Sequence, residues 1–333
     1  MSRLASVTLF LTAAVFATAI NACADETGRP LTINSSPTKF ATGEDAPKIV
    51  GNLAHRGSLR LTSPDKDFGG LSGLIVSEDG ARFLAITDAS HWLTGKLAYT
   101  DGGVLIGASG GEIAPLLDLD GNPLDGKRGD AEGIAGALHG DVFVSFERNH
   151  RIWRYKFGAD GLRAHARPVE TPNELAQAPD NSGLEGIEML ADGRLLALTE
   201  AFADEEGNFR GWLIAPDFKG AAEGIALRRR IPFELTDVRE LPNGDVLTLE
   251  RRFSTAGGVG FAMRRIPGAS IEPGGVLDGD VQIDVGMSFI IDNMEGLAVR
   301  RTGDGKTMIY VLSDDNFNTP PQQTLLMMFE LKE

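Results

Sequence analysis

Acidic side chains recur at matching positions in a set of short, related segments of this 333-residue sequence. Glu132, Glu185 and Glu295 each precede a Gly and then an Ile or Leu. Ser72 and Thr236 take the same place in two further segments. Carboxylates at close range raise one another's pKa, and such groups persist by sharing protons, pairing with arginine or binding a hard cation. The pattern therefore predicts a charged site if the fold brings these segments together.

Each segment continues through a short turn into a second apolar stretch. An Asp-Gly or Asn-Gly pair between apolar runs predicts a β-hairpin, because both central residues of a two-residue type I′ turn have positive φ. The apolar runs are nearly continuous, which favours strands that are buried on both faces. The five predicted turns lie at Asp79-Gly80, His139-Gly140, Asp192-Gly193, Asn243-Gly244 and Asp304-Gly305.

The hairpins also predict which side chains face each other. Positions equidistant from a turn are neighbours, so the start of the first strand lies beside the end of the second. In the first hairpin this places Ser72 opposite Thr87, with Asp88 beside it, and in the fourth it places Asp237 opposite Glu250. The other three hairpins pair two acids: Glu132 with Glu147, Glu185 with Glu200, and Glu295 with Asp314.

The hairpins repeat every 51 to 60 residues, and no helical periodicity separates them. A repeat of this length in an all-β chain predicts a single-domain β-propeller, whose blades surround a central axis. We expect six blades, with five or seven as alternatives, in a domain that spans residues 49–333. Strands within residues 49–61 and 324–331 would complete a further blade. The recurring acids then meet at one end of the central channel.

Charge narrows the choice of partner. The formal charge is −15, from 47 acidic and 32 basic residues. Such a chain does not attract nucleic acid phosphates, so no nucleic-acid partner is expected and cations are favoured. Calcium accepts six to eight oxygen ligands in flexible geometry, which suits clustered carboxylates. We therefore predict a monomer that binds Ca²⁺.

The first 24 residues predict a secretory signal peptide, because Arg3 precedes an apolar stretch that runs from Leu4 to Ile20. This stretch is too short and too interrupted by polar residues to predict a spanning helix. Residues 25–48 predict a flexible lead-in. The protein is therefore expected in the periplasm or outside the cell.

Two processing routes remain open at Cys23, which is the only cysteine. Ala22 and Ala24 fit a small-residue cleavage signal, which would remove Cys23 from the mature chain. Alternatively, residues 20–23 resemble a bacterial lipobox, and Cys23 would become the lipidated first residue. Under the second route a lipid on Cys23 would anchor the protein to a membrane. A single cysteine excludes both an intrachain disulfide and a cysteine zinc site.

Several distinctive segments span nearly the whole predicted domain. They are Gly69-Gly70-Leu71-Ser72-Gly73, the two Glu-Gly-Ile segments, Leu249-Glu250-Arg251-Arg252-Phe253, Asn293-Met294-Glu295-Gly296, Leu312-Ser313-Asp314-Asp315-Asn316-Phe317 and Gln323-Thr324-Leu325-Leu326. Together they resemble the family described as "esterase-like activity of phytase", over about residues 50–331. The resemblance implies an exported bacterial propeller that hydrolyses esters or phosphoesters.

The resemblance and the hairpin pattern together assign roles to particular side chains. The predicted calcium ligands are Glu132, Glu185, Glu295, Asp314 and Asn316. The predicted catalytic residues are Glu185, Glu250 and Arg251. The arginines expected to bind an anionic substrate are Arg56, Arg148 and Arg252. Second-choice site acids are Asp88, Glu147, Glu200, Asp237 and Asp315. Ser72 and Thr236 interrupt the series of glutamates, so a fully symmetric acidic ring is not expected.

Two functions fit these residues. The first is an exported, calcium-dependent hydrolase of phosphate esters or related esters, which would act on a small anionic substrate at the mouth of the channel. The alternative is a non-catalytic periplasmic propeller, in which a cation ties the blades together and the rim binds a protein or ligand. A third interpretation assigns no site, because acids at strand ends can simply pair with the adjacent arginines.

Overall fold

The computed structural model describes residues 28–43, 47–124, 129–219, 222–255 and 257–332. The predicted signal peptide and Cys23 lie outside these residues and stay predictions. In the part of the chain that is described, no helix has the length and apolar character needed to cross a membrane.

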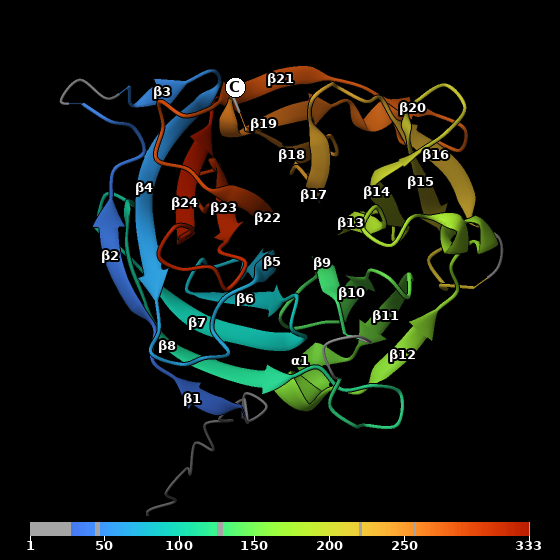
Figure 1. The fold of residues 1–333 in the computed structure, drawn as a ribbon, viewed down its shortest axis with the longest axis horizontal. Helices are drawn as coiled ribbons and strands as arrows, with labels where there is room; N and C mark the ends of the chain where they lie inside the picture. The colour runs from blue at the N-terminus through green and yellow to red at the C-terminus, as the bar shows by residue number, and fades with distance from the viewer. Residues whose placement is uncertain (1–27, 44–46, 125–128, 220–221, 256, 333) are drawn as a thin grey trace, which may run out of the picture.

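Five sheets surround a central axis, and each forms one blade of a β-propeller (Figure 1). The first strand of each repeat lies innermost, where it contacts the first strands of the two neighbouring blades. Later strands of the repeat follow outward, and nearly all neighbouring strands are antiparallel. The prediction of an all-β propeller is therefore confirmed.

From the axis outward, blade 1 comprises β5 (Leu71–Val76), β6 (Arg82–Thr87), β7 (His91–Tyr99), β8 (Leu105–Pro115) and β1 (Arg29–Leu31). Blade 2 comprises β9 (Ala131–Gly136), β10 (Val142–Phe146), β11 (Arg151–Tyr155) and β12 (Ala166–Val169). Blade 3 comprises β13 (Leu184–Met189), β14 (Leu195–Ala203), β15 (Phe209–Ile214), β16 (Glu223–Leu227) and β20 (Val276–Leu277). Blade 4 comprises β17 (Glu234–Glu240), β18 (Val246–Ser254), β19 (Gly258–Ile266) and β21 (Asp280–Val285).

Blade 5 comprises β22 (Asn293–Arg301), β23 (Thr307–Asp314), β24 (Thr324–Leu331), β4 (Leu53–Thr62) and β2 (Asn34–Thr38), and β3 (Ile49–Val50) pairs with β4. Among the described residues, helical structure is limited to α1 (Phe157–Asp160) and to 3₁₀ turns at Gly161–Arg163, Asn173–Gln177 and Gly268–Ser270. These short helices lie in the connections, so strands alone build the blades.

The expectation of six blades is wrong, because the structure has five. The N-terminal strand β4 and the C-terminal strand β24 do pair, as predicted, and they lie side by side in Figure 1. They do not form a blade of their own. Instead they extend the fifth repeat, whose hairpin of β22 and β23 supplies only the inner half of its blade. Pairing of the two ends of the chain thus closes the propeller within blade 5.

The hairpin turns are longer than the predicted two-residue type I′ turns. In blade 3 the Leu190 N–H donates to the carbonyl of Arg194 at 2.9 Å, which leaves a three-residue loop. Gly193 has positive φ, at 87°, whereas Asp192 does not. The equivalent loops of blades 2, 4 and 5 are closed by the same hydrogen bonds. Near these turns, the ladders of blades 2 to 5 are consequently shifted by one residue from the predicted register, whereas blade 1 keeps the predicted register.

A separate apolar core fills the space between each pair of adjacent blades. Between blades 1 and 2, for example, Ile86 and Trp92 of one blade share a cluster with Ile134 and Phe146 of the next. Inner strands are therefore buried on both faces, which the continuous apolar runs predicted. Full burial of a large apolar side chain contributes about 1.5–3 kcal/mol, so the interblade cores dominate the stability of the domain.

Candidate functional site

The innermost strand of every blade carries a bulge at the position of the recurring polar residue. In β13, Leu184 pairs with Thr199 and Gly186 pairs with Leu198, so Glu185 has no partner in the ladder. The same shift of register occurs in β5, β9, β17 and β22. A bulge inserts one extra residue and changes the direction of its side chain. The bulges thus release Glu132, Glu185 and Glu295 from the regular alternation of the strands.

Two of the five bulged residues bind the neighbouring blade. The Ser72 hydroxyl donates to the carbonyl of Ala131 at 2.6 Å, and the Thr236 hydroxyl donates to the carbonyl of Met294 at 3.1 Å. These hydroxyls link adjacent inner strands and bring no negative charge. This explains why the ring of acids at the bulges is incomplete.

A second ring of polar residues surrounds the same opening. In blade 3, Leu184 precedes the bulge and pairs with Thr199 of β14, and Glu200 is the next residue of β14. The equivalent residue of each other blade completes the ring. The second ring consists of Asp88, Glu147, Glu200, Arg251 and Asp314. We call the acids of both rings together the acidic mouth. Its members are Asp88, Glu132, Glu147, Glu185, Glu200, Glu295 and Asp314.

The carboxylates of the acidic mouth lie close together. Oxygen atoms of Glu147, Glu185 and Glu200 all lie within 4.8 Å of one another. A second set, formed by Asp130, Glu132 and Glu147, meets the same limit. Glu147 belongs to both sets and therefore connects blades 2 and 3. Residues that are more than a hundred positions apart in the sequence, such as Glu132 and Glu295, are electrostatic neighbours.

Burial and mutual repulsion raise the pKa of these groups. Burial is the larger cause throughout, and it raises the pKa of Asp88 to about 6 and that of Glu147 to about 7. For Asp314, burial and the nearby Glu295 carboxylate raise the pKa to about 9. Burial also raises the pKa of Glu295 to about 7, although Arg251 opposes the shift. The acidic mouth therefore holds protons at neutral pH unless a cation replaces them.

Arg251 is the basic member of the second ring. One of its Nη atoms lies 2.8 Å from Glu200 Oε1, and the other lies 3.3 Å from Glu295 Oε1. The second Nη also donates to the Asn293 side-chain oxygen at 2.6 Å. Asn293 in turn donates its amide to Glu295 Oε1 at 2.7 Å. Arg251 thus joins the acids of blades 3 and 5 and offsets part of their negative charge.

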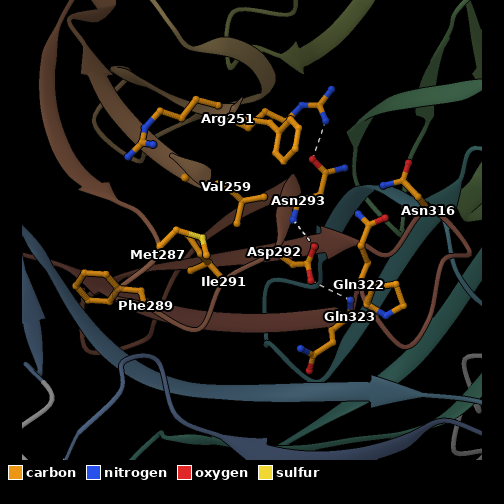
Figure 2. A pocket seen from close by; sticks show the side chains of 15 residues that line it. Arg251, Val259, Met287, Phe289, Ile291, Asp292, Asn293, Asn316, Gln322 and Gln323 are labelled. Atoms are coloured by element: carbon orange, nitrogen blue, oxygen red, sulfur yellow. Dashed lines mark hydrogen bonds between the residues drawn. The ribbon is translucent and has the colours of Figure 1, made fainter. Parts of the chain in front are cut away.

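A cavity of about 600 Å³ opens beside Arg251, between blades 4 and 5 (Figure 2). Arg251, Asn293 and Asn316 line one part of it, and apolar side chains line another part. The apolar lining is formed by Phe253, Val259, Met287, Phe289 and Ile291. No sequence pattern predicted this cavity, because its lining combines the ends of β18 and β19 with connections that have no repeated pattern.

The sequence matches the family described as "Esterase-like activity of phytase" over residues 66–317, which is most of the chain. This chain belongs to that family. The match includes both rings of the acidic mouth, from Ser72 to Asp314, and it confirms the resemblance found in the sequence. Among curated proteins, none matches the sequence.

Two solved structures are similar in fold to this phytase-like chain. A Dyadobacter fermentans protein of unknown function shares 9% identity, with coverage of 93% of this chain and 97% of that chain and a TM-score of 0.43. A gluconolactonase from Xanthomonas campestris shares 12% identity, with coverage of 90% and 97% and a TM-score of 0.41.

The structure does not place Glu250, a predicted catalytic residue, in the acidic mouth. Its carboxylate is buried and accepts hydrogen bonds from Arg264 at 2.6 Å and Thr248 at 2.7 Å. The physical reason is that Glu250 takes the place of Thr199, one residue before the place of Glu200, and adjacent residues of a strand point to opposite faces. Arg251, and not Glu250, occupies the position equivalent to Glu200.

Asp237, a second-choice site acid, instead forms part of a buried network on the axis. Its Oδ1 accepts a hydrogen bond from Arg239 at 2.6 Å, and its Oδ2 accepts the Leu297 N–H at 2.7 Å. Arg239 donates further hydrogen bonds to the carbonyls of Ile187 at 3.1 Å, Leu74 at 3.1 Å and Ile134 at 2.7 Å. The pair thus connects the inner strands of all five blades. No sequence pattern predicted a role for Arg239, because it has no counterpart in the other repeats.

Asp315 and Asn316, which follow Asp314 in the sequence, have different surroundings. Asp315 is buried and accepts hydrogen bonds from the backbone of Gly70 and Phe317 and from the Thr324 hydroxyl, so its contacts are structural. Asn316 lines the cavity, and its N–H donates to Asp314 Oδ1 at 2.7 Å.

The three predicted substrate-binding arginines are separated. Arg56 forms an ion pair with Glu330 within blade 5. Arg148 forms an ion pair with Asp130 at 2.9 Å, beside one of the two carboxylate sets. Arg252 lines the cavity and lies 3.9 Å from Asp284. Only Arg148 and Arg252 therefore lie near the acidic mouth or its cavity.

Proposed function

We propose that this phytase-like protein is a calcium-dependent hydrolase of phosphate esters or related esters. The observation that carries the proposal is the acidic mouth itself, in which seven carboxylates from four blades meet. So many buried acids are unfavourable unless protons or cations compensate their charge. Membership of a family named for esterase-like activity supports hydrolysis as the reaction class.

The donor atoms of the acidic mouth suit calcium. Carboxylate oxygens of Glu147, Glu185 and Glu200 lie close enough to bind one ion together. Asp88 Oδ1 is buried and has no hydrogen-bond partner, so an oxygen ligand is available on blade 1. Glu295 and Asp314, which the sequence predicted as calcium ligands, lie outside the two close sets. We assign calcium to Glu132, Glu147, Glu185 and Glu200.

When bound, calcium would supply a positive charge that polarises the ester or phosphoryl oxygen of the substrate. Glu295, with a pKa of about 7, is suited to accept a proton from the attacking water. The water oxygen forms a bond to the acyl carbon or phosphorus, and the bond to the leaving oxygen breaks. Asp314, with a pKa of about 9, is protonated at neutral pH and can donate its proton to the leaving alcohol.

Arg251 is assigned a positioning role in this reaction. Its guanidinium contacts the Glu295 carboxylate and so holds the base in place beside the cavity. Its positive charge also reduces the repulsion between the acidic mouth and an anionic substrate. The exposed part of Arg148 provides a second positive group near the mouth.

Replacing Glu295 tests the assignment of the base. Glu295→Gln keeps the shape of the side chain but cannot accept the proton, so we expect turnover to fall by about 10²–10⁴-fold. The measurement is hydrolysis of p-nitrophenyl phosphate, bis-p-nitrophenyl phosphate and p-nitrophenyl acetate, before and after chelation and after calcium is restored. Glu78→Gln, on the surface, is the matched control. Full activity of folded Glu295→Gln would contradict the role of Glu295.

A structural cation is the second candidate function, since the acids of the mouth come from blades 1, 2, 3 and 5. A cation at this place would tie those blades together without any reaction. The same assays separate the two functions. Calcium that raises the melting temperature but gives no turnover on any of the three substrates favours the structural role.

We also propose that the protein is exported. Residues 1–24 support this through the signal-peptide pattern, and calcium is abundant outside the cytoplasm. Cell fractionation and the mass of the mature protein test the location and the processing at Cys23. A lipidated chain loses its membrane association in Cys23→Ser, whereas a chain cleaved after Ala24 is unaffected. A cytoplasmic protein that retains Met1 contradicts export.

A further inference from the structure

We propose that the substrate is an amphiphilic ester, whose apolar part lies in the cavity between blades 4 and 5 while its ester group reaches the acidic mouth. The ester group of this substrate rests on the proposed hydrolase function, and its apolar part is inferred from the cavity. Three features of the cavity favour such a substrate: continuity with the acidic mouth, an apolar lining, and a suitable volume.

The cavity is continuous with the acidic mouth, because three residues line the cavity and also bind acids of the mouth. Arg251 lines the cavity and contacts both Glu200 and Glu295. Asn293 lines the cavity and donates a hydrogen bond to Glu295. Asn316 lines the cavity and donates its N–H to Asp314. A molecule in the cavity therefore lies next to the acids that we assign as base and acid.

The apolar lining is unusual for an exposed part of a strongly acidic protein. Phe253 is 72% exposed and Met287 is 68% exposed, and both border the cavity. Phe289 and Ile291, which are partly buried, extend the apolar lining (Figure 2). The Phe289 ring packs on Phe40 at 4.8 Å between ring centroids. Exposed apolar residues that are grouped around a cavity indicate a binding site.

Volume and polarity then select the class of substrate. Cavities of about 300–1,000 Å³ are typical of sites for small molecules, and this cavity measures about 600 Å³. A substrate that is charged over its whole surface, such as an inositol polyphosphate, gains nothing from Phe253, Met287 and Phe289. An ester with one polar end and an aliphatic or aromatic end matches both parts of the lining.

Binding of two phosphonates tests the cavity without any reaction. Octylphosphonic acid and methylphosphonic acid share one head group and differ only in the apolar chain. Each buried methylene strengthens binding about fourfold, so burial of two methylenes already gives more than tenfold. We expect calorimetry on the calcium-loaded full chain to show octylphosphonic acid binding at least tenfold more tightly.

Variants at exposed positions locate the binding site. Met287→Asp and Phe253→Ser change exposed side chains, and we expect each to remove most of the advantage of octylphosphonic acid. Ile49→Ser is the matched control, because Ile49 is 56% exposed and lies in β3, outside the cavity lining. Equal binding of both phosphonates, or an octyl advantage that survives in both cavity variants, overturns the inference.

Hydrolysis of p-nitrophenyl esters from acetate to octanoate separates this inference from the proposed function. A rate that rises with chain length, and loses that rise in Met287→Asp, supports the inference. Hydrolysis with no dependence on chain length overturns the inference and leaves the hydrolase standing. Octyl-selective binding without hydrolysis of any ester supports the cavity and contradicts the hydrolase.

Discussion

At the scale of single residues, the raised pKa values of the acidic mouth make the stability of the folded protein depend on pH. In the folded protein the pKa of Glu295 is raised from 4.5 to about 7, and that of Asp314 from 3.8 to about 9. The folded state therefore binds more protons than the unfolded chain between about pH 4 and 9, and this part of its stability is lost as the pH rises. Bound calcium would replace the lost protons.

We accordingly expect the melting temperature in chelator to fall as the pH rises from 5 to 9, and calcium to reverse most of the fall at the alkaline end. Thermal unfolding at several pH values, with EDTA or with calcium, measures the effect. Glu295→Gln removes one titrating group, so its melting temperature should depend less on pH in EDTA. A melting temperature that rises steadily with pH in EDTA would mean that the raised pKa values are wrong.

At the scale of secondary-structure elements, the bulge and the glycine that follows it act together. A Cβ atom at Gly133 would overlap the backbone oxygen of Glu185 on the adjacent inner strand. The glycine thus permits the close packing of β9 against β13, which brings Glu132 near Glu185. The Glu-Gly step in the sequence therefore has a packing reason as well as a chemical one.

Gly133→Ala should destabilise the fold by about 1–3 kcal/mol, the usual cost of excess volume in a packed core, and should weaken calcium binding. Urea unfolding and calcium titration of the same sample give the two quantities. Gly224→Ala in β16 is the matched control, because no atom lies within 4 Å of a Cβ added there. Equal effects of the two substitutions would argue against the proposed packing role.

At the scale of the whole molecule, Arg239 and Asp237 connect all five blades through one buried ion pair on the axis. Arg239→Met removes the ion pair of the Asp237 carboxylate and the donor of the Leu74, Ile134 and Ile187 carbonyls. Because such a loss leaves an uncompensated buried charge, we expect destabilisation of about 3–5 kcal/mol in urea unfolding. Adding Asp237→Leu to Arg239→Met should recover part of the loss. A single Arg239→Met variant as stable as the wild type would show that the connection is dispensable.

Much of this architecture is encoded locally and was therefore accessible from the sequence. The turn pairs located all five hairpins, and the continuous apolar runs predicted strands buried on both faces, because both patterns depend on near neighbours in the chain. The repeated placement of Glu132, Glu185 and Glu295 predicted their convergence, since equivalent positions in a closed ring of repeats share one end of the axis.

Other features depend on contacts between distant segments, and only the tertiary structure decided them. The number of blades follows from where β4 and β24 close the ring. Arg251, and not Glu250, turns toward the acidic mouth, because adjacent residues of a strand point to opposite faces and the pairing of β17 with β18 decides which residue follows the bulge. Arg239 and the apolar cavity depend on side chains from several blades, and no local pattern in the sequence records which of them meet.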